Sequence, residues 1–214
     1  MKRVVFIDRD GVINKDPGGW TKHSYVTRWK DFHFIRGAKR AIRILSANRF
    51  DLVVISNQGG ISKGFFTENR LDAINSGMLK EIKGSGGRIR KTYYCIHQSS
   101  DECDCRKPEI GLFKRAGGQL GIRIKGSFFI GDGKVDVEAG HKAGLKTILV
   151  LSGKTALSDV DEWSVKPDYI FKDLAEASKF IIESYNGLHK IQDRDSFMTP
   201  QRRKKPQRRK KNQH

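Results

Sequence analysis

Long apolar runs are missing from this sequence of 214 residues. No stretch approaches the roughly 18 apolar residues that suggest a membrane-spanning helix, so we expect no membrane partner. The N-terminal apolar stretch from Val4 to Ile7 is too short for the core of a secretory signal peptide. These absences predict a cytoplasmic protein.

Cysteine is also scarce, with three in the whole chain. All three lie within eleven residues, at Cys95, Cys103 and Cys105. A structural disulfide is not expected in a reducing cytoplasm. The three thiols therefore belong to a metal site, to a redox-active group, or to an unrelated set of buried side chains.

Acidic residues are outnumbered: 24 Asp and Glu stand against 42 Lys and Arg, which gives a formal net charge of +18. Residues 201–214 hold eight of the basic residues and no acid, so the rest of the chain keeps 34 basic residues against 24 acidic ones. This charge attracts phosphorylated small molecules, and it attracts nucleic acid non-specifically. Net charge therefore leaves both kinds of partner open.

The C-terminal segment has no apolar periodicity and repeats the unit Pro-Gln-Arg-Arg-Lys-Lys. Such a segment cannot bury enough surface to offset the entropy of its chain. We therefore predict a disordered basic tail over residues 189–214, after one domain over residues 1–188.

Within that domain, short apolar runs alternate with helical patterns. The runs predict strands over residues 4–8, 52–56, 91–95, 127–131 and 147–151. Apolar spacing predicts helices over residues 38–45, 71–82 and 174–181, with Thr67 as the N-cap of the second and Gly187 ending the third. This alternation predicts an α/β fold with a doubly wound parallel sheet.

Polar side chains follow several of these strands at the edge where an open α/β sheet binds its ligands. Asp8 and Asp10 follow the first strand, Ser56 ends the second, and Asp132 follows a later one. Two nearby carboxylates favour different protonation states or a shared cation, so one can act as a nucleophile while the other transfers protons. Gly11 would permit a tight turn or a close approach of the backbone to a ligand. The alternative is an ordinary charged turn after a strand.

Four segments resemble the motifs of the haloacid dehalogenase (HAD) superfamily of phosphatases. They are, in chain order, DRDGVIN, VVISNQGGISKGFF, CRKPEIGLF and FFIGDGKVD. The resemblance spans roughly residues 4–150 and implies a Rossmann-like HAD fold with little or no cap domain. It also implies a magnesium-dependent phosphomonoesterase that works through an aspartyl-phosphate intermediate.

The resemblance assigns roles to individual residues. Asp8 is the implied nucleophile and Asp10 the acid and base, while phosphate or substrate is bound by Ser56, Asn57, Arg106 and Lys107. Magnesium is expected at Asp8, the Asp10 carbonyl and Asp132, with Asp136 either supporting that site or orienting Lys107. Asp136 could instead cap a nearby helix, and Lys107 and Arg106 could be solvated surface charges.

The cysteines share a second spacing with His97, C-x-H-x5-C-x-C over residues 95–105. Cys95, His97, Cys103 and Cys105 are the four soft ligands of a closed tetrahedral zinc site. With no open position for water, such a zinc ion would be structural. We expect this zinc-binding loop to lie outside the sheet.

The cysteine cluster followed by Arg106-Lys107-Pro108 resembles the heptose 1,7-bisphosphate phosphatases and the histidinol-phosphate phosphatases. HFIRGAKRAIRIL and YYCIH are more similar to the heptose enzymes, whereas the five-residue spacer after His97 is closer to the histidinol enzymes. The expected substrate is a sugar phosphate such as D-glycero-D-manno-heptose 1,7-bisphosphate, and histidinol phosphate is the alternative.

Three further expectations concern the substrate entrance, the oligomeric state and an alternative function. The stretch 16–32 after the first motif could reshape the substrate entrance, and the chain is expected to be a monomer. A reading from another class is a nucleic-acid-associated protein or a nucleic-acid 3′-phosphatase that uses the basic tail.

Overall fold

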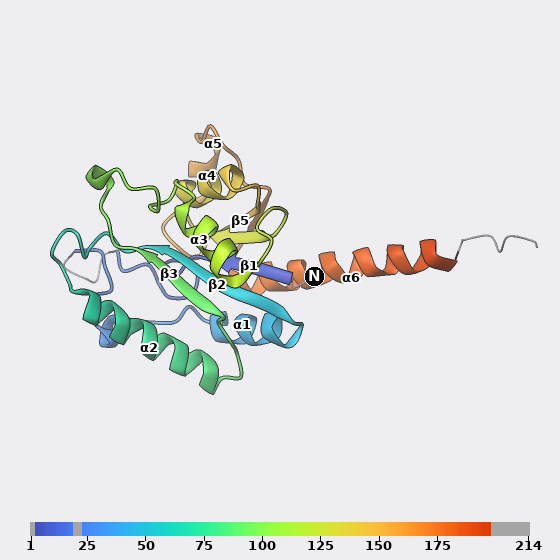
Figure 1. Ribbon diagram of the computed structural model, residues 1–214, viewed down its shortest axis with the longest axis horizontal. Coiled ribbons are helices and arrows are strands. Elements are labelled where there is room, and N and C mark those ends of the chain that lie inside the picture. The colour runs from blue at the N-terminus through green and yellow to red at the C-terminus, as the bar shows by residue number, and fades with distance from the viewer. Residues whose placement is uncertain (1–2, 19–22, 198–214) are drawn as a thin grey trace, which may run out of the picture. The chain divides into compact units, whose positions relative to one another are not determined.

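A computed structural model describes residues 3–18 and 23–197, the last eleven of them as backbone only. The described chain contains one parallel six-stranded sheet with the order β3-β2-β1-β4-β5-β6 (Figure 1). The strands are β1 (Arg3–Ile7), β2 (Phe50–Asn57), β3 (Lys91–Cys95), β4 (Phe128–Gly131), β5 (Lys146–Val150) and β6 (Tyr169–Phe171). The order reverses direction at β1, and a ligand crevice is expected beyond the carboxyl ends of strands at such a point.

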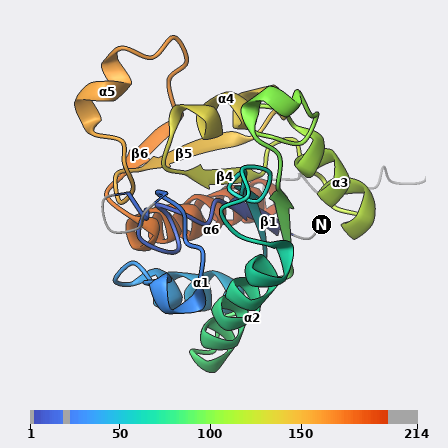
Figure 2. The ribbon, with the colours of Figure 1, turned by 90° about the vertical axis from the view of Figure 1, so that its left-hand side faces the viewer.

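Helices cover the two faces of this sheet. They are α1 (Ala38–Ala47), α2 (Glu68–Gly84), α3 (Gly111–Leu120), α4 (Lys134–Lys142), α5 (Leu157–Asp161) and α6 (Leu174–Phe197), with single 3-10 turns η1 (Trp29–Asp31) and η2 (Ser99–Asp101). Figure 2 shows α1 and α2 on one side of the strands and α3 and α4 on the other. The α/β fold with a doubly wound parallel sheet is therefore confirmed.

The central strands are buried on both faces, which explains their unbroken apolar runs. From Val4 to Ile7 no residue of β1 is more than 1% exposed. Phe6 meets Phe113 of α3 edge-on at 5.2 Å between ring centroids, and Phe113 meets Phe129 of β4 at 5.0 Å. This packing gives the ends of β1 and β4, where the polar residues follow, a rigid base.

The predicted strands match the observed ones to within two residues at each end. Thr67 is the N-cap of α2, where its hydroxyl accepts a hydrogen bond from the backbone N–H of Arg70 at 3.4 Å. The predicted end at Gly187 is wrong, because α6 continues to Phe197. Glycine weakens a helix by only about 1 kcal/mol, so one glycine does not have to end it.

Some short elements were not predicted from the sequence. Strand β6 has three half-exposed or exposed residues, and α5 has five residues, so neither carries a readable apolar period. Helix α3 contains three glycines, at positions 111, 117 and 118, which obscure its apolar stripe. Each of these elements is defined by its neighbours in the fold rather than by its own sequence.

The chain divides into two units, residues 1–182 and 183–214, rather than at residue 188. The backbone of residues 189–197 is helical, so disorder is not observed over that part of the predicted tail. Residues 198–214, which include the charged repeat, lie outside the described residues. Among the described helices, none has the length and apolar character needed to cross a membrane.

Candidate functional site

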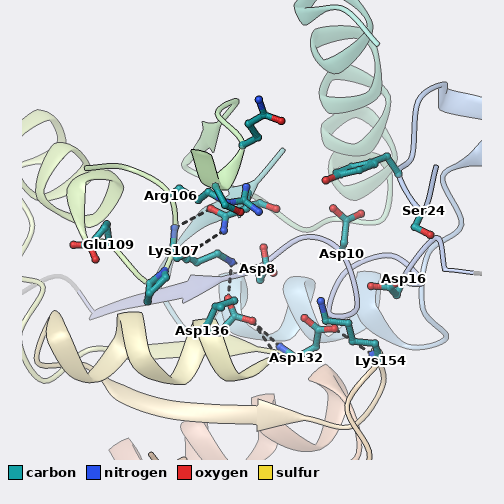
Figure 3. Close-up of a pocket in the computed structure, with 18 of the residues that line it drawn as sticks. Asp8, Asp10, Asp16, Ser24, Arg106, Lys107, Glu109, Asp132, Asp136 and Lys154 are labelled. Atoms are coloured by element: carbon teal, nitrogen blue, oxygen red, sulfur yellow. Dashed lines mark hydrogen bonds and ion pairs between the residues drawn. The ribbon is translucent and has the colours of Figure 1, made fainter. Parts of the chain in front are cut away.

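A cavity of about 690 Å³ opens at the carboxyl ends of β1, β2 and β4 (Figure 3). All eight residues predicted for catalysis, phosphate and magnesium line it: Asp8, Asp10, Ser56, Asn57, Arg106, Lys107, Asp132 and Asp136. Parallel strands end at one edge of the sheet, so residues far apart in the sequence meet there. The cavity is the candidate active site.

Lys107 lies at the centre of the buried charges. Its Nζ is 3.0 Å from Asp8 Oδ2 and 2.6 Å from Asp136 Oδ1, and the residue is 3% exposed. Burial alone would lower the pKa of Lys107, but Asp136 and Asp8 together raise it above its ordinary value. The solvated surface lysine is therefore ruled out, and a permanent positive charge stands beside Asp8.

Asn57 reaches Lys107 through the backbone. Its Nδ2 donates to the Lys107 carbonyl at 3.1 Å, and its Oδ1 accepts from the Lys107 N–H at 3.0 Å. Both ends of the amide are used in this way, so the side chain of Asn57 positions Lys107. Arg106, in turn, donates from Nη1 to the carbonyl of His97 at 3.0 Å, which ties the cavity to the cysteine cluster.

Three carboxylates converge beside Lys107. Asp8, Asp132 and Asp136 are all buried, and each offers an oxygen within 4.8 Å of the other two. Burial raises the pKa of Asp8 to about 6, against the opposing effect of Lys107 and with further repulsion from Asp136 and Asp10. Burial, followed by repulsion from Asp136 and Asp8, raises the pKa of Asp132 well above its ordinary value.

This oxygen cluster fits a hard divalent cation such as Mg²⁺, which carboxylates bind and which would relieve the repulsion. Gly11 leaves room for the Asp132 carboxylate: its φ is +76°, and a Cβ there would collide with that carboxylate. Gly153 approaches the same carboxylate equally closely. The close contact at Gly11 is with the Asp132 side chain, and its close approach to a ligand stays a prediction.

Asp136 combines two of its predicted roles. Its Oδ2 accepts from the backbone N–H groups of Asp132 at 3.2 Å and Gly133 at 3.0 Å, at the start of α4. Its Oδ1 faces Lys107. The helix cap and the lysine contact therefore use different oxygens of one carboxylate.

Asp10 lies at the cavity wall, and its carboxylate is outside the cluster of three. Arg9, Asn14 and Gln58 all donate to it, with nearest distances of 2.9, 2.8 and 2.7 Å. The sequence interpretation missed the side chains of these three donors. Their one available signal was position, since Arg9 and Gln58 directly follow strand ends that were already singled out.

The cysteine cluster has the dimensions of a tetrahedral metal site. The three Sγ–Sγ distances are 3.6, 3.3 and 3.5 Å, and His97 Nδ1 lies 3.3 Å from Cys105 Sγ and 3.7 Å from Cys95 Sγ. Zinc bonds of normal length imply edges of about 3.8 Å between sulfurs and about 3.5 Å between sulfur and nitrogen. A disulfide would need sulfurs about 2.05 Å apart. The four side chains therefore form a candidate metal site.

The predicted position of this cluster outside the sheet is wrong for its first member. Cys95 is the last residue of β3 and is 0% exposed, and Cys105 is 5% exposed. Both belong to the apolar cluster that includes Phe6 and Phe113. The strand predicted over residues 91–95 already included Cys95, so the expectation that the whole loop lies outside the sheet conflicted with it.

The stretch 16–32 borders the cavity through Asp16, Pro17, Ser24 and Tyr25. Tyr25 lies 5.8 Å from Phe65, ring to ring, and His23 stacks on the same phenylalanine at 4.1 Å. Residues 19–22 lie outside the described residues. The expectation that this stretch shapes the entrance agrees with its described part.

Comparison with known proteins identifies the class of enzyme. Residues 104–177 match the HAD-hydrolase-like family model, and this segment carries Arg106, Lys107, Asp132 and Asp136. The protein is a HAD-like hydrolase and, within that class, a phosphomonoesterase.

The relatives narrow the family. The chain is 34% identical over 188 residues to the D-glycero-beta-D-manno-heptose-1,7-bisphosphate 7-phosphatase of Pasteurella multocida, which covers 85% of this chain and 97% of the relative. Its identity to the enzyme of that name from Vibrio cholerae is 39% over 161 residues, or 72% and 83% of the two chains. The chain belongs to the D-glycero-D-manno-heptose-1,7-bisphosphate 7-phosphatase family.

A solved structure agrees with this assignment. The D,D-heptose 1,7-bisphosphate phosphatase of B. bronchiseptica, solved with magnesium and phosphate, has a TM-score of 0.78 and 25% identity, over 85% of this chain and 99% of that chain. The implied HAD fold is thereby confirmed, and the described chain shows no separate cap domain.

Proposed function

We propose that this enzyme removes the 7-phosphate of D-glycero-D-manno-heptose 1,7-bisphosphate. The observation that carries phosphoryl transfer is the buried Lys107, which bridges Asp8 and Asp136 in the cavity. The extent of similarity to heptose bisphosphate 7-phosphatases supports the substrate.

Asp8 is the nucleophile in this proposal. One carboxylate oxygen attacks phosphorus, the bond to the sugar oxygen breaks, and an aspartyl-phosphate forms. Asp10, from the same loop, gives a proton to the departing alkoxide and then takes one from the water that hydrolyses the intermediate. Asp8 is released as a carboxylate, together with inorganic phosphate.

The other side chains supply position and charge. Lys107 neutralises charge on the transferring phosphoryl group, Ser56 donates to one of its oxygens, and Arg106 faces the substrate from the cavity wall. Asp8, the Asp10 carbonyl and Asp132 would hold the magnesium ion. Bound there, magnesium would neutralise phosphoryl charge and hold the reacting groups in line.

Zinc at Cys95, His97, Cys103 and Cys105 is the second metal of the proposal. Four protein ligands leave no open position, so its role is structural. Arg106 donates a hydrogen bond to the carbonyl of His97, which is one of the four ligands. A bound zinc ion would therefore fix the loop that presents Arg106 and Lys107.

A substrate panel tests the proposed function. Phosphate release by the full chain is measured with magnesium on the heptose bisphosphate, histidinol phosphate and a 3′-phosphorylated oligonucleotide. We expect kcat/KM for the heptose to exceed that for histidinol phosphate by about 100-fold or more. Faster hydrolysis of histidinol phosphate, or of the oligonucleotide, would replace the proposed substrate.

A gel shift with and without residues 201–214 tests the nucleic-acid reading separately. Binding that disappears with those residues confines nucleic-acid affinity to the basic segment.

A further inference from the structure

Asp10 is held from behind the cavity wall by a closed set of hydrogen bonds. Arg9 and Gln58 are each 0% exposed, and neither lines the cavity. Arg9 Nη2 donates to Asp10 Oδ2 and to Gln58 Oε1, both at 2.9 Å. Gln58 Nε2 donates to Asp10 Oδ2 at 2.7 Å. The side chains of Arg9, Gln58 and Asp10 thus form a triangle of hydrogen bonds, and Asp10 is its catalytic member.

Chemistry fixes the direction of every bond in this triangle. A guanidinium can only donate, so Arg9 faces the oxygen of the Gln58 amide and turns the amide NH₂ towards Asp10. The same NH₂ lies 3.2 Å from Ser56 Oγ. The orientation of Gln58 is therefore set by Arg9 and not by chance.

Burial of the Arg9 guanidinium costs free energy. Its Nε and Nη1 have no hydrogen-bond partner, and its guanidinium carbon lies 5.7 Å from the centre of the Tyr94 ring. An apolar side chain commonly fills a buried space at equal or lower cost than a buried ion pair. The cost is explained if the pair controls where Asp10 lies.

All the described partners of the Asp10 carboxylate are donors, since Asn14 Nδ2 also donates to Oδ1, at 2.8 Å. These contacts fix where the Asp10 carboxylate lies. In the proposed reaction Asp10 becomes a carboxylate once it has given its proton to the leaving alkoxide. In the second step it takes a proton from water, whose oxygen bonds to phosphorus as the bond from phosphorus to Asp8 breaks.

We propose that Gln58, oriented by Arg9, is a positioning residue that holds the Asp10 carboxylate for hydrolysis of the aspartyl-phosphate. This inference rests on the proposed function of Asp8 and Asp10. It makes a distinctive demand with a good leaving group, which needs little help from Asp10 as an acid. Loss of Gln58 then slows the second chemical step, in which Asp10 is the base, much more than the first.

The variant Gln58→Met tests this with p-nitrophenyl phosphate, whose leaving group needs little help from an acid. Rapid-quench measurement of phosphorylated enzyme is expected to show formation within about threefold of wild type and decay slowed by about tenfold or more. Steady-state kcat then falls while kcat/KM hardly changes. Gln119→Met is the control, because its amide accepts from the Tyr93 hydroxyl at 3.1 Å and does not line the cavity; both steps should stay at the wild-type rate.

A second variant protects the test against misfolding. Gln58→Glu keeps the shape of the side chain and can accept from Arg9, but its carboxylate cannot donate to Asp10, so decay should again be slowed. Arg9→Lys should slow decay as well, and the double variant Arg9→Lys/Gln58→Met should lose little more than the worse single one.

Equal slowing of both steps in Gln58→Met, or unchanged decay in folded Gln58→Met and Gln58→Glu, would overturn the inference. Failure of the proposed function has another appearance: wild-type enzyme would form no phosphorylated intermediate with any of the phosphate esters.

Discussion

Two clusters of metal-binding type lie at the carboxyl ends of the same sheet, and they differ in every property that matters for metal chemistry. Asp8, Asp132 and Asp136 offer hard oxygens and face an open cavity. The Cys95 to Cys105 cluster offers sulfur and one nitrogen, and two of its members belong to the apolar core. The first cluster suits an ion that is shared with a substrate, and the second suits an ion enclosed by four protein ligands.

The surrounding charges sharpen this contrast. Repulsion and burial raise the pKa of Asp8 and of Asp132, so the oxygen cluster is unfavourable as a set of free anions. Lys107 offsets part of that repulsion from one side. Two hydrogen bonds join the two regions: Arg106 donates to the carbonyl of His97, and the backbone N–H of Gln58 donates to the carbonyl of Cys95 at 2.6 Å. The clusters should therefore fail in different ways when they are altered.

The largest expected effect is on catalysis, from Asp8→Asn. An amide cannot form the acyl-phosphate, so kcat should fall by about 10⁴-fold or more, while metal at the cysteine cluster stays unchanged. Phosphate release and metal content on the same preparation measure both. Activity within tenfold of wild type, with deamidation ruled out by mass spectrometry, would remove Asp8 from the nucleophile role.

Stability should respond most at the other cluster. Cys95→Ser and Cys103→Ser each remove one metal ligand, but Cys95 is 0% exposed in the core and Cys103 lies at its margin. Cys95→Ser should lower the free energy of unfolding by about 1–2 kcal/mol more than Cys103→Ser. The serine hydroxyl at position 95 would be buried without a hydrogen-bond partner. Urea denaturation of the matched pair checks this. Equal losses would mean that the core position of Cys95 carries no weight.

Loss of Cys103 alone is expected to leave the main α/β core folded. Cys95 and Cys105 differ, because both are buried in that core.

A smaller effect is expected in the pH dependence of stability without metal. The pKa of Asp8 rises from 3.8 to about 6 on folding. A carboxyl group with a raised pKa leaves stability intact below pH 3.8 and removes it as pH rises towards 6, because the unfolded state then binds fewer protons than the folded state. The total is about 3 kcal/mol.

Comparison of wild type with Asp8→Asn isolates this contribution. In EDTA, wild type should lose stability relative to the variant between pH 4 and pH 6 in urea denaturation, and magnesium should restore much of the loss at pH 7. A constant difference between the two proteins across this range would show that Asp8 is not destabilised by its surroundings.

Much of this architecture can be read from the sequence, for identifiable physical reasons. Strands buried on both faces are apolar throughout, so β1 and β2 can be recognised from their sequences. The residues that follow parallel strands meet at one edge of the sheet. Spacing alone brought Cys95, His97, Cys103 and Cys105 together.

Other features depend on contacts that no local pattern encodes. The side-chain amide of Asn57 bonds to the backbone of Lys107, fifty residues away, a contact that the sequence did not indicate. The buried position of the Arg9 side chain depends on Gln58, which follows β2, and on Tyr94 in β3. Helix α6 passes Gly187 because a single glycine is too weak a signal to end it.

Metal analysis tests the division between the two clusters most directly. Protein purified without a histidine tag is dialysed against EDTA, and its zinc content and activity are measured before and after magnesium is restored. We predict close to one zinc per chain throughout, activity lost in EDTA, and activity recovered with magnesium alone. Zinc near zero together with full activity after magnesium is restored would contradict the account, because the four soft ligands would then not be a structural metal site.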